Sequence, residues 1–142
     1  RPLNARLSFR QRGSAHRRLA NPNGIAWDAR EARFVIVPKG GDTLVTWRPG
    51  DAEPRPLAVG PGQFDGVVLT GDGRLLVSSQ ASDAVLLLVG DRLVPILPDL
   101  PGVADIGLDA RGRLAVPRLS AGTVTLYALP ALPPATAAAD VR

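Results

Sequence analysis

A unit of about 40 residues recurs three times along this chain, and this repeat restricts the possible folds more than any other feature of the sequence. The three copies begin at Asn23, Asp65 and Ala104, so the offsets between them are 42 and 39 residues. Each copy opens with a short apolar run, passes through a polar turn into a second apolar run, and reaches a third run after another turn. Each copy therefore predicts one small antiparallel sheet.

The apolar runs of the repeat predict its strands. The first strands are expected at 25–27, 67–69 and 106–108, the second strands at 34–37, 75–77 and 114–116, and the third strands at 43–47, 84–88 and 123–127. The segments "PRPLAV" and "RLVPIL" predict a fourth strand in the first two copies, where proline suits an outer edge strand. Between the first and second strands, the Asp72-Gly73 and Arg111-Gly112 pairs favour tight hairpins with positive φ.

A four-stranded sheet that repeats at this spacing is typical of a β-propeller, in which the sheets, called blades, cover their apolar faces by packing around a common axis. The expected fold class is therefore all-β, a β-propeller of about three four-stranded blades. A β-sandwich with a similar number of strands is the structural alternative. However, a sandwich gives no reason for every fourth strand to repeat the same sequence.

The repeat also predicts how the chain is divided. The expected parts are the last strands of a preceding blade at 1–21, blades at 22–62 and 63–102, an incomplete last blade at 103–129, and a disordered tail at 130–142. Because a closed propeller needs at least about four blades, we expect either missing N-terminal blades or a second chain to close the ring. We favour the first, with this chain as the C-terminal part of a six-bladed propeller. The chain opens with Arg1 and contains no Met, from which we expect a processed or truncated product.

Composition and charge restrict the class of function. Cysteine is absent from the chain, so it offers neither disulfides nor thiolate metal ligands. The longest apolar run, 84–89, has the length of a strand and is too short to cross a bilayer. Residues 1–27 hold six arginines and no acid. Over 3–10, polar residues that include Arg6 and Arg10 alternate with apolar ones, and the arginines are interpreted as facing water on one side of a strand. We therefore expect a soluble chain with neither a nucleic-acid nor a membrane partner; nothing in the sequence indicates its cellular location.

Asn23 and Asp65 occupy equivalent positions, each directly before the first strand of its unit. In a propeller these positions surround one mouth of the central channel, and carboxylate and carboxamide oxygens suit a hard divalent cation such as Ca²⁺ or Mg²⁺. Ala104 supplies no ligand; its neighbour Asp105 is a further candidate, although one position along a strand directs its side chain to the opposite face. Asn-Gly and Asp-Gly pairs are also among the commonest turn formers, so simple turns remain the alternative interpretation.

The remaining candidates for chemistry are weaker. His16 is the only histidine, and in a chain without cysteine it cannot join a transition-metal cluster. No Gly-x-Ser-x-Gly elbow surrounds Ser78 and Ser79, which argues against a catalytic triad. Trp27 and Trp47 lie on predicted strands and are interpreted as core or blade-packing residues rather than as a platform for a ligand.

Three segments, "NPNGIAWD", "QFDGVVLTGDGRLLVSS" and "VADIGLDARGRLAVPRLSAGTVTLY", resemble the later blades of the gluconolactonase and regucalcin family of six-bladed propellers, over residues 20–128. Propellers of the NHL-repeat and strictosidine-synthase-like types share much of this pattern. The resemblance implies that the Asn of the "NG" motif and the Asp of the "DG" motif, here Asn23 and Asp65, bind a catalytic divalent cation (Ca²⁺, Mg²⁺, Zn²⁺ or Mn²⁺). The family also uses a first-blade Glu and polar residues of the second blade, and this chain contains no counterpart to either.

The activity that the resemblance implies is hydrolysis of a sugar-type lactone. The cation would polarise the ring carbonyl as a Lewis acid, and Asp65 would act as the general base that accepts a proton from water. The alternative is a non-catalytic propeller that binds a small molecule or a protein partner through its loops, since this fold serves many unrelated functions. A first-blade Glu in sequence upstream of Arg1 would favour the enzyme.

Overall fold

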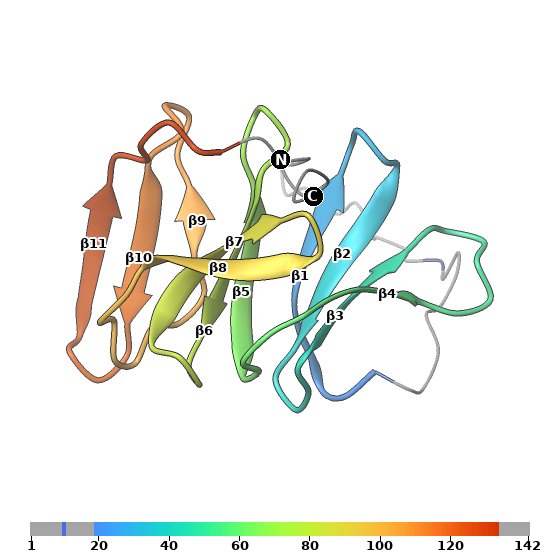
Figure 1. The fold of residues 1–142 in the computed structure, drawn as a ribbon, viewed down its shortest axis with the longest axis horizontal. Helices are drawn as coiled ribbons and strands as arrows, with labels where there is room; N and C mark the ends of the chain where they lie inside the picture. Colours follow the sequence, from blue (N-terminus) through green and yellow to red (C-terminus); the bar gives the residue numbers. More distant parts are fainter. Residues whose placement is uncertain (1–9, 11–18, 134–142) are drawn as a thin grey trace, which may run out of the picture.

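The computed structural model describes residue 10 and residues 19–133, and over this range the chain forms strands joined by turns and loops (Figure 1). The strands are β1 (Pro22–Asp28), β2 (Arg33–Pro38), β3 (Thr43–Trp47), β4 (Arg55–Val59), β5 (Phe64–Leu69), β6 (Leu75–Ser79), β7 (Ala84–Val89), β8 (Arg92–Leu97), β9 (Gly107–Leu108), β10 (Leu114–Arg118) and β11 (Thr123–Tyr127). Every strand that the repeat predicts is present. No helix of the described part has the length and apolar character needed to cross a membrane.

Neighbouring strands pair in antiparallel fashion within three groups, which lie side by side in Figure 1. We call β1–β4 the first blade, β5–β8 the second blade and β9–β11 the third blade. A single parallel pair, Val59 with Arg92, joins β4 to β8 at the outer edge, so the first two blades form one continuous sheet. The third blade is a separate three-stranded sheet in the order β11-β10-β9.

The hairpins between the first and second strands confirm the predicted turn chemistry. Gly73 and Gly112 have φ of 84° and 73°, the left-handed conformation in which glycine carries no steric penalty. Ala32 takes the corresponding place in the first blade with φ of 50°. That hairpin therefore carries the backbone strain that glycine avoids in the other two.

The entrance to each blade repeats in three dimensions. The residue two positions before each repeat unit has a positive φ, and its carbonyl accepts a hydrogen bond from the backbone N–H just after the second strand. The acceptor and donor pairs are Asn21 with Lys39 (2.8 Å), Gln63 with Gln80 (3.0 Å) and Gly102 with Leu119 (2.8 Å). Lys39, Gln80 and Leu119 are thus structurally equivalent, and their side chains leave the blades at the same end.

The core consists of two apolar clusters, one on each side of the second blade. On β6, Leu75 and Val77 face the first blade, whereas Leu76 between them faces the third. All five residues of β6 are buried, as expected for a strand between two neighbouring blades. The first cluster contains Val35, Val37, Leu44, Phe64, Val67, Leu75, Val77, Ala84 and Leu86, and the second contains Leu76, Val85, Leu87, Leu100, Val103, Ile106, Leu114 and Val116.

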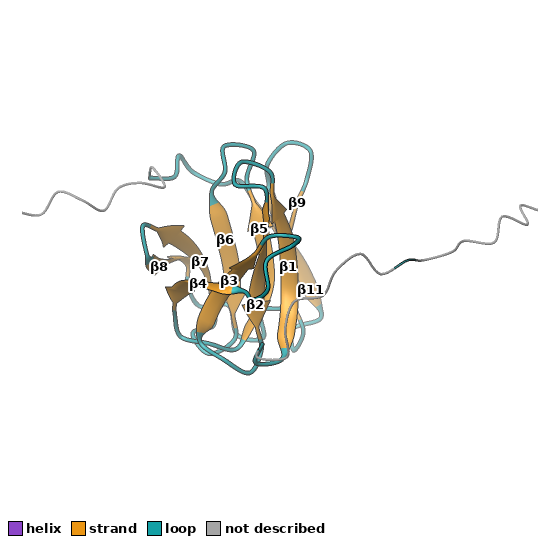
Figure 2. Cartoon of the chain, turned by 90° about the vertical axis from the view of Figure 1, so that its right-hand side faces the viewer, coloured by secondary structure: helices purple, strands orange, loops and turns teal. Residues whose placement is uncertain are grey.

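The outer face of the first blade is not covered by another described element, and Figure 2 views the molecule from that side. Ile25 and Trp27 are 59% and 46% exposed there. The ring of Phe34 packs edge-on against Trp27 at 4.9 Å and stacks on Trp47 at 6.2 Å. Both tryptophans therefore lie on this open blade face and not between two described blades.

Two predicted segments lie largely outside the described residues. Of the predicted strands of a preceding blade at 1–21, the structure describes only residues 10 and 19–21, and His16 is not among them. Of the predicted tail at 130–142, it describes 130–133, which form no strand. The carbonyl of Leu132 accepts a hydrogen bond of 2.6 Å from Nη2 of Arg74, which links this segment to the second blade.

Candidate functional site

The innermost strands of the three blades approach one another so closely that two positions admit only glycine. A Cβ atom at Gly24 of β1 would lie 2.4 Å from the backbone oxygen of Asp65, and a Cβ atom at Gly66 of β5 would lie 2.4 Å from the backbone nitrogen of Ile106. Neither glycine has a positive φ, and both lie within strands. The interpretation of the Asn-Gly and Asp-Gly pairs as turns is therefore wrong: their glycines allow neighbouring blades to meet near the axis.

Asn23 and Asp65 lie at β-bulges at corresponding ends of their strands. The ladder between β1 and β2 skips Asn23, and the ladder between β5 and β6 skips Asp65 and Gly66. A bulge leaves a residue out of regular pairing and redirects its side chain, which is why bulges are frequent beside functional sites. The same local device thus places both side chains at one end of the inner strands.

A chain of hydrogen bonds joins four polar side chains at this end. Nδ2 of Asn23 donates to Oδ1 of Asp65 (3.3 Å) and to the backbone oxygen of Phe64 (3.2 Å). On the other side of the carboxylate, Nε2 of Gln80 donates to Oδ2 of Asp65 (3.1 Å), and Nζ of Lys39 donates to Oε1 of Gln80. We call Asn23, Lys39, Asp65 and Gln80 the polar mouth.

The third blade supplies no equivalent polar group. Ala104 takes the place of Asn23 and Asp65, and Leu119, which is 70% exposed, takes the place of Lys39 and Gln80. Asp105 does not replace them, because its Oδ1 accepts a hydrogen bond of 2.9 Å from the backbone N–H of the next residue. Of the three described blades, only the first and the second therefore contribute to the polar mouth.

The donor set at the polar mouth suits part of a cation site. Oδ1 of Asn23 accepts no hydrogen bond from the described residues, and each carboxylate oxygen of Asp65 accepts one and keeps a free lone pair. These hard oxygens are what Ca²⁺ or Mg²⁺ requires, although a Ca²⁺ ion takes about 6–8 oxygen ligands. Within residues 19–133, no three His, Cys, Asp or Glu side chains gather as a metal site. The described chain thus offers two of the ligands and needs others.

Sequence reasoning placed Asn23 and Asp65 at the site and missed Lys39 and Gln80. A signal was available, because Lys39 is the only lysine in the chain while the other 16 basic side chains are arginine. Alignment of the repeats at the ends of the second strands would then have put Gln80 at the matching position.

An open cleft of ≈ 610 Å³ lies beside Lys39. Its walls are two glycine-rich loops, 39–42 and 61–63, together with Ala81. The polar side chains that line it are Lys39, Asp42 and Gln63. A ligand in this cleft would meet mainly backbone, with a cation on one side and a carboxylate nearby.

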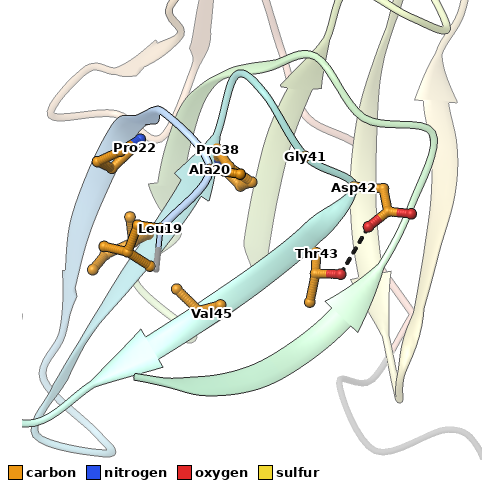
Figure 3. A pocket seen from close by; sticks show the side chains of 9 residues that line it. Leu19, Ala20, Pro22, Pro38, Gly41, Asp42, Thr43 and Val45 are labelled. Carbon is orange, nitrogen blue, oxygen red and sulfur yellow. Dashed lines mark hydrogen bonds between the residues drawn. The ribbon is translucent and has the colours of Figure 1, made fainter. Parts of the chain in front are cut away.

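A second, apolar cavity of ≈ 170 Å³ belongs to the uncovered face of the first blade (Figure 3). Leu19, Ile36 and Val45 line it, and its carboxylate, Asp42, accepts a hydrogen bond of 2.8 Å from Thr43. Its apolar lining matches the faces that pack between blades elsewhere in the molecule. We therefore assign this cavity to blade packing and not to the functional site.

No protein-family model and no curated protein sequence matches this chain, whereas several solved structures do. Virginiamycin B lyase from Staphylococcus aureus matches with a TM-score of 0.56 and 14% identity over 78% of this chain and 42% of its own. A gluconolactonase from Xanthomonas campestris matches with a TM-score of 0.54 and 24% identity over 70% of this chain and 35% of its own. This chain has a β-propeller fold. The predicted fold class is confirmed.

A protein of a different kind also shares this fold. The extracellular domain of a hybrid two component system from B. thetaiotaomicron matches the propeller with a TM-score of 0.61 and 15% identity over 84% of this chain and 17% of its own. The propeller chain spans less than half the length of each of these three structures. Because all three identities are below 25%, the likeness is one of fold alone.

Proposed function

We propose that the complete protein is a divalent-metal-dependent hydrolase of lactone-type small molecules, and that this chain supplies its C-terminal blades. The observation that carries the proposal is the meeting of Asn23 and Asp65 at 3.3 Å, where matching bulges on neighbouring inner strands bring the two side chains to one mouth of the propeller. The gluconolactonase from X. campestris shares the fold, which is consistent with this chemistry.

In the proposed site, Oδ1 of Asn23 and a carboxylate oxygen of Asp65 would hold the cation. A bound cation supplies Lewis-acid polarisation of the lactone carbonyl and increases the acidity of water. Asp65 accepts the proton of the attacking water on a free lone pair of its carboxylate. The N–H donors of Asn23 and Gln80 fix the plane of that carboxylate by binding one oxygen each, so the acceptor does not need to reorganise.

The proposal includes a partner that closes the ring, either N-terminal blades of the same protein, which we favour, or a second chain. The outer face of the first blade carries Phe34 and Ile36 at the positions where the second blade carries Leu75 and Val77, and that pair packs on the first blade. The uncovered face thus repeats a surface that the structure already shows buried against a blade. A further blade is therefore the occupant that fits it.

A non-catalytic propeller that binds a small molecule or a protein partner through its loops remains the second candidate. The observation in its favour is the third blade, which places Ala104 and Leu119 where the other two blades carry polar side chains. A ring of ligands that ends after two blades binds a cation more weakly than a complete one, because fewer oxygens replace its hydration shell.

The test is lactone hydrolysis by the complete protein, assayed after removal of divalent cations and again after addition of Ca²⁺, Mg²⁺, Zn²⁺ or Mn²⁺. We expect at least one cation to raise the rate, and Asp65→Asn to lower the stimulated rate by about 100-fold or more, because it removes the base and replaces an anionic ligand by a neutral amide oxygen. Asp91→Asn, in the exposed turn after β7, is the matched control and should keep full activity. Equal activity of wild type and Asp65→Asn would refute the assignment, and absence of hydrolysis with every cation would favour the binding propeller.

A further inference from the structure

The charge of Lys39 has no counter-ion among the described residues. Five of the ten described arginines pair with carboxylates, and these are Arg33, Arg48, Arg55, Arg74 and Arg113. Lys39 is absent from these pairs and donates instead to the neutral amide oxygen of Gln80. Its ammonium group has three donors, of which this contact uses one. A half-buried cation with unused donors is suited to bind an anion.

Gln80 couples this cation to the predicted catalytic carboxylate. An ammonium group can only donate, so Gln80 must present Oε1 to Lys39, and its Nε2 then faces Oδ2 of Asp65 at 3.1 Å. The orientation of the amide is therefore fixed by charge at both ends. Displacement of Lys39 would free the amide to rotate, and the carboxylate of Asp65 would lose one of its two side-chain donors.

The cleft beside Lys39 sets the kind of ligand that the cation can receive. Its volume of ≈ 610 Å³ falls in the range of small-molecule sites, about 300–1,000 Å³. Asp42 also lines the cleft, so a second anionic group on the ligand would meet a carboxylate. Hydroxyl groups, in contrast, can donate to Asp42 and to the carbonyls of the surrounding loops. A ligand with one anionic group and several hydroxyls fits both charges.

We propose that Lys39 binds the carboxylate of a hydroxylated monocarboxylic acid in this cleft, and that Asp42 accepts a hydroxyl of the same ligand. The inference rests on the proposed function for the choice of ligand. When water opens a lactone, its oxygen bonds to the carbonyl carbon, the bond from that carbon to the ring oxygen breaks, and the ring oxygen takes a proton. The product is a hydroxy acid, which loses a proton to become a carboxylate. Lys39 is thus placed to hold the product.

The test is calorimetric titration of the complete protein with gluconate, a hydroxylated monocarboxylate, in the presence of a chelator so that no cation takes part. We expect saturable binding, and Lys39→Gln should weaken it about tenfold, as expected for loss of one charge-assisted hydrogen bond. Lys39→Arg should retain most of the affinity. Glucose, which has the hydroxyls without the carboxylate, should bind at least about tenfold more weakly than gluconate.

The controls separate this inference from the proposed function. Asp42→Asn should improve binding of glucarate, which carries a second carboxylate, relative to gluconate. Leu119→Gln, at the equivalent place in the third blade, should leave the affinity for gluconate unchanged because Leu119 lies outside the cleft. Equal binding of gluconate by wild type and Lys39→Gln, or no binding of gluconate at all, overturns the inference. Binding that depends on Lys39 in a protein without metal-stimulated hydrolysis would support the inference while refuting the hydrolase.

Discussion

Two interfaces join the described blades: the first interface lies between the first and second blades, and the second interface lies between the second and third blades. Both contain a close approach of backbone at a glycine, but they differ in the polar side chains beside it. Each has a glycine at the closest approach, Gly24 in the first and Gly66 in the second. At the first interface the neighbouring side chains, Asn23 and Asp65, remain at the surface and bind each other. At the second interface Ser78, fully buried, accepts a hydrogen bond from Gly66 N–H (2.8 Å) and donates to the backbone oxygen of Ala104 (2.7 Å).

This difference shows that the same arrangement of inner strands can either close the junction between two blades or leave polar groups exposed there. At the second interface a hydroxyl satisfies buried backbone groups and closes the junction between blades. The corresponding residue of β2 is Val37, an apolar side chain that packs in the first cluster and provides no such bridge, and the polar side chains of that junction lie at the mouth. The first interface thus leaves donors and acceptors available for a ligand, and the second uses them for stability.

The largest loss of stability is expected from a substitution at the feature that both interfaces share, the glycine at the closest approach of the inner strands. Gly66→Ala places a methyl group 2.4 Å from the nitrogen of Ile106 and 2.5 Å from a carboxylate oxygen of Asp105, so neighbouring backbone must move. We expect the free energy of unfolding to fall by about 3 kcal/mol, measured by urea denaturation. Gly107→Ala on β9 is the matched control, because its methyl group meets nothing within 4 Å. Equal stability of the two variants would contradict the close approach of the inner strands.

The next effect tests the second interface alone. Ser78→Ala leaves the buried N–H of Gly66 and the oxygen of Ala104 without this partner, which should lower the free energy of unfolding by about 2 kcal/mol. Ser82→Ala, an exposed serine in the turn before β7, should change it by less than about 0.5 kcal/mol. If Ser78→Ala were as stable as the control, the contrast between a structural and a functional interface would be lost.

The smallest effect concerns pH. The backbone N–H of Arg113 donates to Asp109, and this hydrogen bond, together with the guanidinium of Arg113, holds the pKa of that carboxyl below its ordinary value of 3.8. A lowered pKa in the folded state means that the stabilisation is present above pH 3.8 and is lost as the pH falls through the folded pKa. We therefore expect Asp109→Asn to lower the melting temperature slightly at pH 7, with the gap to wild type closing below about pH 4.

The dependence of stability on pH also tests the second interface. The second interface joins a hydroxyl to backbone groups and contains no titrating side chain in its bridge, so Ser78→Ala should lower stability equally at pH 7 and at pH 3. A gap between wild type and Ser78→Ala that closed in acid would show that a titrating group takes part in this junction. A pH-independent gap for Asp109→Asn would equally contradict its assigned role.

The strand order could be predicted because the three copies of the repeat can be aligned with one another, which identifies corresponding strands. Runs such as 34–37 and 75–77 are apolar on both faces, and a strand of this kind needs neighbours on both sides. The hairpin glycines Gly73 and Gly112 could also be placed, since their positive φ is a local property of the turn. In both cases the physical cause lies within a few residues of the signal.

The rest of the site depended on contacts between blades, which no local pattern encodes. Asn-Gly and Asp-Gly have the composition of turns, and only the distance of 2.4 Å across the blade interface shows why the glycines are needed. The role of Ser78 was equally hidden, because a serine that bridges Gly66 and Ala104 differs from a solvated serine only in its neighbours. Gln80 was missed for a different reason, because its contact with Asp65 lies within the second blade and only alignment of the ends of the second strands indicates it.

The placement of the two tryptophans gives this molecule an optical property. Trp27 and Trp47, which are all the tryptophan in the chain, flank Phe34 on the open side of the first blade. Indole emission shifts to shorter wavelength when water leaves its surroundings, so the tryptophan fluorescence of this chain reports on the open face of the first blade and not on the packing between the described blades. Binding of a polypeptide to this face would therefore shift the tryptophan emission to shorter wavelength, and this shift can be measured without a label.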